Sequence, residues 1–261
     1  MPEDADWRDF FDVDKCESIG VDISPRYERK ILEETDRYYI ATSEWGVTMK
    51  HFKEQDSTPE FLDFTVTTEE AWAEAKKRME ITPDRVNRDY LKRNYGKWVK
   101  EGRFIQAGFW FGFDVTHSWM VGTETLLIAL MENPEWVKDM IGTYLDSCIK
   151  LFDMVWDAGY RFDEIYWPDD MGYKGTTFFS PATYREIVKP FHKKRDRRIE
   201  RVSAEDVRKP APHRRGNAAA HGPEAPARQQ HEHVAQVKIP ERERDDDGEC
   251  RHTAQRGKQR R

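Results

Sequence analysis

The composition of the chain changes abruptly after Lys194, and this break limits what the chain can fold into. All 33 aromatic residues lie before it, and the 67 residues that follow contain no Phe, Trp, Tyr, Leu or Met. Such a segment cannot bury enough apolar surface to offset the entropy lost when its backbone is ordered. We therefore predict a folded domain over residues 1–194 and a disordered C-terminal tail over residues 195–261.

The two segments also differ in charge, because residues 1–194 carry a net charge of −11 and the tail carries +5. A basic tail suits a protein that binds acidic partners. Acidic residues at 245–247 interrupt the basic charge, and no aromatic ring is available to stack on bases, so the pattern argues against nucleic acid. A tail rich in Arg, Ala, Pro, His and Gly is also typical of GC-rich coding DNA translated out of frame. Sequencing the DNA around codon 194 tests that hypothesis.

Several protein classes have no support in this sequence. No apolar run approaches the roughly 20 residues that cross a bilayer, and the acidic N-terminus does not read as a secretory signal. The three cysteines are far apart and form no CxxC pair, so a reducing cytoplasm is the expected compartment. The chain has no GxGxxG, Walker A, GxSxG or HExxH motif, and no metal-ligand pattern is evident.

Local patterns in the first segment indicate an α/β fold. Residues 36–53 are rich in β-branched and aromatic side chains and predict two strands joined by a turn. Residues 103–110 and 162–167 predict buried strands. Between them, Asn133 caps a long helix whose apolar stripe includes Cys148. Since strands and helices alternate after residue 103, we expect parallel strands. Helix starts are also predicted at Thr68 and at Ser180-Pro181, with the last helix running to about Lys194.

Polar residues that follow the predicted strands are the candidates for chemistry, because active sites of parallel α/β folds lie at the carboxyl ends of strands. We take Asp169 and Asp170 as catalytic candidates, since paired carboxylates act as general acids or hold a substrate. The alternative is that they cap loop backbone. His117, Tyr173 and Glu44 are candidate substrate-binding residues, with a turn role as the alternative for Glu44.

Two arginines near the N-terminus form a further candidate group. Arg26 and Arg29 lie in a short charged stretch and are suited to clamp substrate carboxylates. The alternative is an exposed helix face.

The segment Asp169-Asp-Met-Gly-Tyr-Lys-Gly, with the Ser180-Pro helix start and the Pro190-Phe-His-Lys that follows, resembles the uroporphyrinogen decarboxylase superfamily. That superfamily also contains corrinoid-linked methyltransferases. Upstream, Ser43-Glu-Trp-Gly-Val, Met120-Val-Gly-Thr-Glu and Asn133-Pro-Glu-Trp-Val match it in the same order. The resemblance covers residues 20–194 and implies a (β/α)8 TIM barrel, incomplete here as its N-terminal half to two-thirds. It places Asp169 and Asp170 in the mouth where relatives contact substrate.

The chain lacks several motifs of the superfamily, and their absence bears on which activity the resemblance implies. The Arg-Gln-Ala-Gly-Arg segment that binds the acidic arms of the porphyrinogen is absent, and so is the Phe-Ser-Asp segment with the catalytic aspartate, for which Asp22 is a loose stand-in. The zinc site of methyltransferase relatives should follow Lys194, where the tail lies. The resemblance therefore implies a divergent methyltransferase-like protein, inactive if it is only a fragment. Its substrate would be a methylated small molecule or a tetrapyrrole, with zinc or corrinoid in the full-length relative and a corrinoid protein as partner. The alternative is a non-catalytic interaction protein whose basic tail binds acidic partners.

Overall fold

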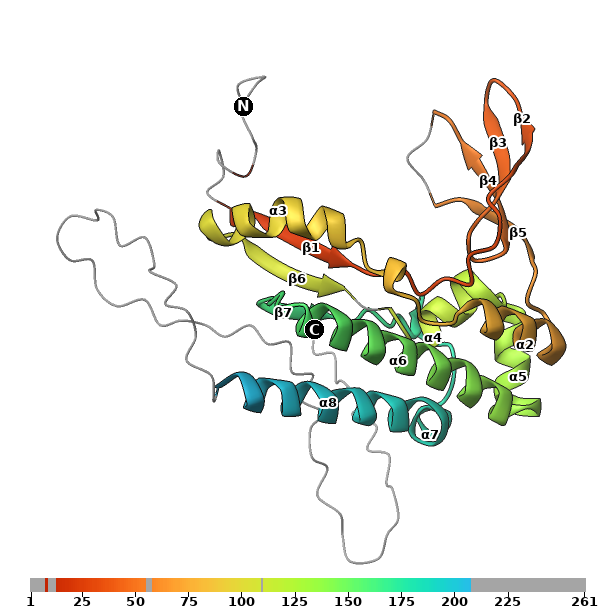
Figure 1. Ribbon diagram of the computed structural model, residues 1–261. Helices are drawn as coiled ribbons and strands as arrows, with labels where there is room; N and C mark the ends of the chain where they lie inside the picture. The colour runs from red at the N-terminus through yellow and green to blue at the C-terminus, as the bar shows by residue number, and fades with distance from the viewer. Residues whose placement is uncertain (1–7, 9–12, 55–57, 109, 208–261) are drawn as a thin grey trace, which may run out of the picture. The chain divides into compact units, whose positions relative to one another are not determined.

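A three-stranded parallel sheet lies at the centre of the part of the chain that the computed structural model describes, which is residues 8, 13–54, 58–108 and 110–207 (Figure 1). Its strand order is β1-β6-β7, with β1 at Cys16–Gly20, β6 at Phe104–Gly108 and β7 at Glu164–Tyr166. Gly20 lies opposite Gly108, which in turn lies opposite Tyr166, so all three strands end at one edge. The parallel pairing predicted after residue 103 is confirmed.

A second sheet is antiparallel, with strand order β2-β3-β4-β5. It consists of β2 (Ile31–Glu34), β3 (Tyr38–Thr42), β4 (Val47–Phe52) and β5 (Glu60–Phe64). β3 and β4 are the two strands predicted within residues 36–53, and the turn between them contains Glu44 and Trp45. β8 (Gly172–Tyr173) and β9 (Thr176–Thr177) form a short hairpin.

The prediction of an incomplete (β/α)8 TIM barrel is wrong. In the described ranges only three strands pair in parallel, and they form an open sheet. A barrel of that type needs a helix after each strand, because a parallel pair requires a long crossover connection. The described residues of 31–64 contain four strands and no helix, and neighbouring strands pair antiparallel.

Side-chain caps set the helix starts that the sequence predicts. Thr68, Asn133 and Ser180 each accept a hydrogen bond from the backbone N–H three residues later, at 3.2, 3.4 and 3.1 Å. This arrangement satisfies N–H groups that a first helical turn leaves without partners. The helices are α2 (Glu69–Arg78), α3 (Arg88–Lys100), α4 (Phe113–Val115), α5 (Thr123–Glu132), α6 (Pro134–Asp157), α7 (Pro181–Thr183) and α8 (Lys189–Val207).

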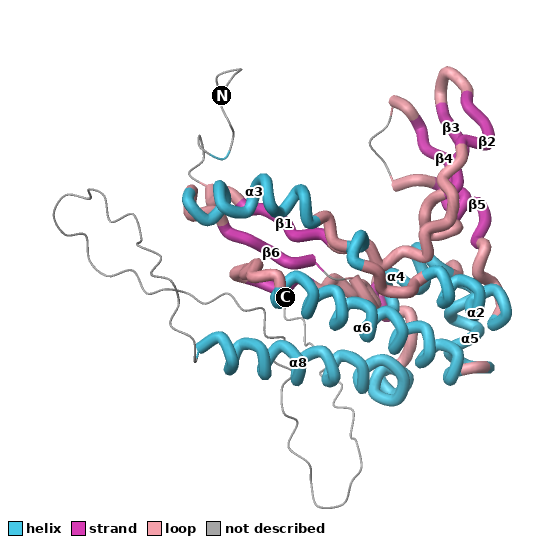
Figure 2. The backbone as a smooth tube through the Cα atoms, in the orientation of Figure 1, coloured by secondary structure: helices cyan, strands magenta, loops and turns pink. Residues whose placement is uncertain are grey.

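Helix α6 carries much of the core. Its apolar stripe is buried, including Cys148 as predicted, and α6 contacts α2, α5 and α8 (Figure 2). Burial raises the pKa of the Cys148 thiol far above its ordinary value, as expected for a thiol with no water around it.

Helix α8 differs from the prediction because it continues past Lys194 to Val207. Lys194 pairs with Asp146 of α6 at 2.5 Å, and Arg198 pairs with Asp153 of α6. These ion pairs connect the first turns of α8 to α6, and residues 195–207 are helical where disorder was predicted. The remainder of the predicted tail, 208–261, lies outside the described residues. Within the described ranges, no helix is both long and apolar enough to cross a bilayer.

Candidate functional site

A cleft of about 470 Å³ opens where β1 and β6 end. Three segments form it: the loop after β1, the turn between β3 and β4, and the end of β6. The side chains that give it chemical character are Asp22, Arg26, Tyr27, Glu44, Trp45 and Trp110. Glu44 lies in the turn between β3 and β4 and lines this cleft. Its contact with a substrate stays a prediction. The location agrees with the expectation that function gathers at the carboxyl ends of parallel strands.

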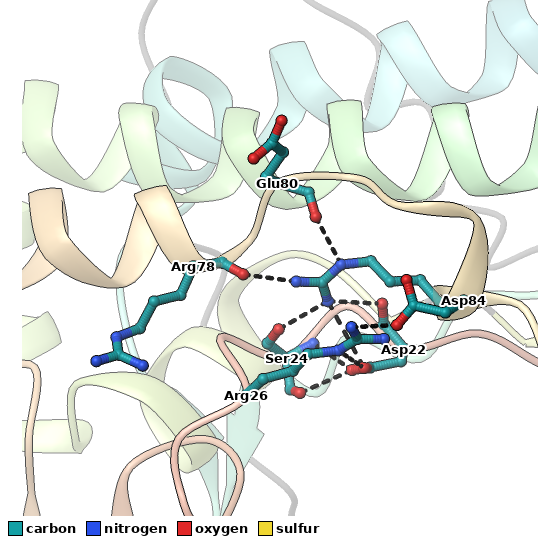
Figure 3. A network of polar contacts seen from close by, with 7 residues as sticks. Asp22, Ser24, Arg26, Arg78, Glu80 and Asp84 are labelled. Carbon is teal, nitrogen blue, oxygen red and sulfur yellow. Dashed lines mark hydrogen bonds and ion pairs between the residues drawn. The ribbon is translucent and has the colours of Figure 1, made fainter.

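Asp22 organises the loop that follows β1 (Figure 3). Its Oδ1 accepts hydrogen bonds from the backbone N–H of Ser24 at 2.9 Å and from the Ser24 hydroxyl at 2.7 Å. Its Oδ2 accepts from Nε of Arg26 at 2.6 Å, and Nη1 of Arg26 also donates to Asp84 at 2.5 Å. Arg26 has a φ of 54°, a conformation that non-glycine residues adopt rarely. The two carboxylates hold its guanidinium in place.

The side chain of Arg85 holds the loop after β1 against the end of α2. Its side chain is 1% exposed, and its guanidinium donates to the backbone carbonyls of Arg78, Glu80, Asp22 and Ser24 at 2.6 to 3.0 Å. A single buried side chain thus joins the end of α2 to the loop after β1. Burial lowers the pKa of the Arg85 guanidinium, yet an arginine stays charged in this setting.

The electrostatics of the loop favour an ionised Asp22. Burial by itself raises the pKa of the Asp22 carboxyl, but the hydrogen bonds from Ser24 and Arg26 outweigh burial and hold that pKa below its ordinary value. Asp22 is consequently a fixed anionic acceptor at neutral pH. It is unsuited to donate a proton as a general acid.

Aromatic rings form the other wall of the cleft. The ring centroids of Trp45 and Trp110 are 6.2 Å apart in an edge-to-face arrangement, and Trp110 donates from Nε1 to Asp114 at 2.8 Å. Arg29 lies 3.5 Å from Glu44, and neither side chain is buried. Arg26 and Arg29 belong to a loop, so the alternative that they lie on a helix face is wrong. The pair of rings and the carboxylates give the cleft both apolar and acceptor surfaces.

Asp169 is buried in a junction of three segments. Its side chain is 7% exposed, Oδ2 lies 2.9 Å from Nε2 of His192 on α8, and Oδ1 accepts from the backbone N–H of Asp114 at 2.8 Å. Nδ1 of His192 lies 3.2 Å from the hydroxyl of Tyr184. A Cβ on Gly112 would come within 2.4 Å of the Asp169 carboxylate. Both carboxylate oxygens therefore make contacts that hold the fold together.

Asp170 and Tyr173 lie apart from this junction. Asp170 is exposed, and its Oδ1 accepts from the backbone N–H of Gly172 at 3.0 Å, as the loop-capping alternative describes. Tyr173 is exposed on β8, with its ring 5.2 Å from that of Phe178. The structure thus does not bring the carboxylates of Asp169 and Asp170 into one site, and their catalytic roles stay predictions.

His117 lies on a π-helical turn, Thr116–Met120, that follows α4. Its Nδ1 is 3.0 Å from the hydroxyl of Thr123, and its Nε2 is 3.1 Å from the hydroxyl of Ser118 and 3.6 Å from Asp114. Burial by itself raises the pKa of the Asp114 carboxyl, but hydrogen bonds with His117 and Trp110 outweigh it and lower that pKa. Through Asp114, His117 is linked to the Trp110 wall of the cleft.

Within the described ranges, no three His, Cys, Asp or Glu side chains converge as a metal site requires. The zinc site that the resemblance implies would follow Lys194, and residues 208–261 lie outside the described part of the chain, so that site stays a prediction. Comparison of the chain with family models, with curated proteins and with solved structures gave no match.

Sequence reasoning assigned no role to Arg85 or His192, although both organise the ends of parallel strands. Arg85 follows a Pro-Asp pair in a polar stretch, where an exposed arginine is the usual expectation. His192 was part of the motif that carries the resemblance, but its contact with Asp169 spans residues far apart in sequence. No local signal could have shown either partnership.

Proposed function

We propose that this chain is a divergent, methyltransferase-like member of the uroporphyrinogen decarboxylase superfamily that binds a methylated small molecule in the cleft at the ends of β1 and β6. The observation that carries this proposal is the charge of the lining. Arg26, the cation of the lining, is already bound to Asp22 and Asp84, and the other charged lining groups, Asp22 and Glu44, are carboxylates. A tetrapyrrole with several carboxylate arms needs cations that are available to it. A methylated molecule without such arms fits this lining better.

The residues of the cleft have binding and orienting roles in this proposal. Trp45 and Trp110 supply apolar surface that excludes water from one side of the ligand, and Asp22 supplies a fixed acceptor. The resemblance implies a corrinoid protein as partner, and a bound corrinoid supplies the methyl acceptor in such enzymes. We also propose a reducing, cytoplasmic compartment, since the thiols of Cys16 and Cys148 are both free.

The alternative of an interaction protein rests on the basic tail. Residues 208–261 lie outside the described part of the chain, so no structural observation favours that alternative.

A binding experiment with the full chain separates the two branches of the superfamily. Uroporphyrin binding is followed by the anisotropy of its own fluorescence, and binding of choline and of 1,2-dimethoxybenzene is followed by tryptophan emission, since Trp45 and Trp110 line the cleft. The proposal predicts a saturable change with at least one methylated compound and no change for uroporphyrin. Saturable uroporphyrin binding, or no response to either methylated compound, overturns it.

A further inference from the structure

We infer that the cleft selects a methylated organic cation, such as a quaternary ammonium group, over neutral and anionic methylated molecules. This inference rests on the proposed function, because it names the ligand class for the same cleft. Three observations carry it: the aromatic wall, the carboxylates beside that wall, and the commitment of the nearby arginines to other partners.

The aromatic wall has the character of a cation site. Trp45, Trp110 and Tyr27 line the cleft together. Trp45 is only 8% exposed and packs edge to face against Trp110 at a centroid distance of 6.2 Å, so the half-buried rings of Trp110 and Tyr27 offer most of the accessible aromatic surface. Aromatic faces attract cations through their quadrupole, and a quaternary ammonium is held well by such rings because its methyl groups are weakly hydrated. One face of Tyr27 already carries a cation, since the Arg78 guanidinium lies 4.9 Å from its ring centroid. This region of the protein therefore already uses the interaction that the ligand requires.

Two carboxylates complete the site. Asp22 is held in place by three hydrogen bonds from Ser24 and Arg26, and its side chain is 36% exposed at the cleft. Glu44 is 43% exposed, and its one ion pair among the described residues is with Arg29 at 3.5 Å, which is itself 77% exposed. A pair this open to solvent contributes little binding energy. Glu44 can consequently turn toward a ligand cation at small cost.

The arginines near the cleft would favour an anion if their guanidinium groups were available. Arg26 bridges Asp22 and Asp84, and Arg85 is buried with its N–H groups on backbone carbonyls. Arg78 lies on the ring of Tyr27, and Arg29 extends into solvent beside Glu44. An anionic ligand would have to displace Asp22 or Asp84 from Arg26. A cation can approach Glu44 without breaking either of these pairs, because it competes there only with the exposed side chain of Arg29.

Three probes of one shape test the selection. Choline, the neutral 3,3-dimethylbutan-1-ol and the anionic 3,3-dimethylbutanoate share the same branched head, and only the charge of the molecule changes. Each is titrated into the full chain at low ionic strength while tryptophan emission is recorded. We expect choline to bind about three- to thirtyfold more tightly than the neutral alcohol, the range typical of a cation on aromatic faces. Equal affinities, or tightest binding of the anion, overturn the inference.

A matched pair of variants locates the effect. Glu44→Gln keeps the shape of the side chain and removes its charge, so choline affinity should fall about three- to fivefold while affinity for the neutral alcohol stays the same. Glu34→Gln, on the outer strand β2, makes the same chemical change away from the cleft and should alter neither affinity. Equal losses in both variants, or no loss in Glu44→Gln, would contradict a site at this cleft.

The outcomes separate this inference from the proposed function. If 1,2-dimethoxybenzene or the neutral alcohol binds as tightly as choline, the cleft takes methylated molecules without selecting a cation, and only the inference fails. If uroporphyrin binds in their place, the proposed function fails as well.

Discussion

Asp22 and Asp169 follow two strands that flank the same central strand, yet their surroundings differ. Asp22 follows β1, lines a cleft and is 36% exposed. Asp169 follows β7, is 7% exposed and has both oxygens bound to other segments of the domain. The comparison teaches that a carboxylate at the end of a parallel strand does not by itself mark a site. What matters is whether an oxygen remains accessible beside a cavity.

The difference has a physical origin in the neighbouring elements. At the end of β7, α8 brings His192 against Asp169, and α4 brings the backbone N–H of Asp114 to its other oxygen. At the end of β1, the hydrogen-bond donors to the Asp22 carboxylate come from its own loop, with Arg85 at 3.7 Å as an ion-pair partner, and the side chain stays 36% exposed. Buried polar groups that are fully satisfied mainly specify the fold.

The largest effect is expected at the support of the cleft loop. Arg85→Met removes a buried guanidinium and leaves several backbone carbonyls without a donor, so the free energy of unfolding should fall by about 3–5 kcal/mol. Urea unfolding followed by circular dichroism measures this. Arg93→Met, on the exposed surface of α3, is the control and should change stability by less than about 0.5 kcal/mol. Similar values for the two variants would show that Arg85 does not hold the loop.

A second prediction concerns the junction around Asp169. Gly112 has φ 117° and ψ −153°, which essentially only glycine adopts, and its missing Cβ leaves room for the Asp169 carboxylate. Gly112→Ala should lower the free energy of unfolding by about 2–5 kcal/mol. Gly96→Ala, in the middle of α3 with nothing near its Cβ, should stabilise by about 0.5–1 kcal/mol.

A double variant shows whether the packing at Gly112 involves Asp169 itself. Adding Asp169→Ala to Gly112→Ala removes the overlap but not the backbone strain, so the two changes should be less damaging together than the sum of their separate effects. Strict additivity would indicate that Asp169 does not occupy this place.

The stability contributed by the charge of Asp22 should depend on pH. The folded-state pKa of Asp22 lies below the value near 3.9 of an unfolded chain, so its charge stabilises the fold above that pH and the contribution is lost as pH falls toward the folded pKa. Asp22→Asn should therefore be less stable than the unmodified chain above about pH 5, and the difference should shrink below about pH 4. Unfolding midpoints in urea between pH 3 and pH 7 measure this. A difference that grows at low pH would contradict it.

The sequence was a good guide to local structure and a poor guide to what the segments form together. The caps at Thr68, Asn133 and Ser180 and the strands in residues 36–53 follow from local rules, and all are present. The barrel was wrong because antiparallel pairing of residues 31–64 depends on turn lengths rather than on strand propensity. Glu44 lies in the turn that the alternative describes and also lines a cleft, so its substrate-binding role stays a prediction, whereas the burial of Asp169 depends on His192, 23 positions along the chain.

The most direct test compares two isosteric variants, Glu44→Gln and Asp169→Asn. Choline affinity is measured for each by tryptophan emission, and stability is measured by urea unfolding. We predict that Glu44→Gln weakens choline binding about three- to fivefold and leaves stability unchanged. Asp169→Asn should lower the free energy of unfolding by about 1–2 kcal/mol and leave choline affinity of the folded protein unchanged. If Asp169→Asn weakens choline binding as much as Glu44→Gln does, the distinction between an open cleft and a structural junction is contradicted.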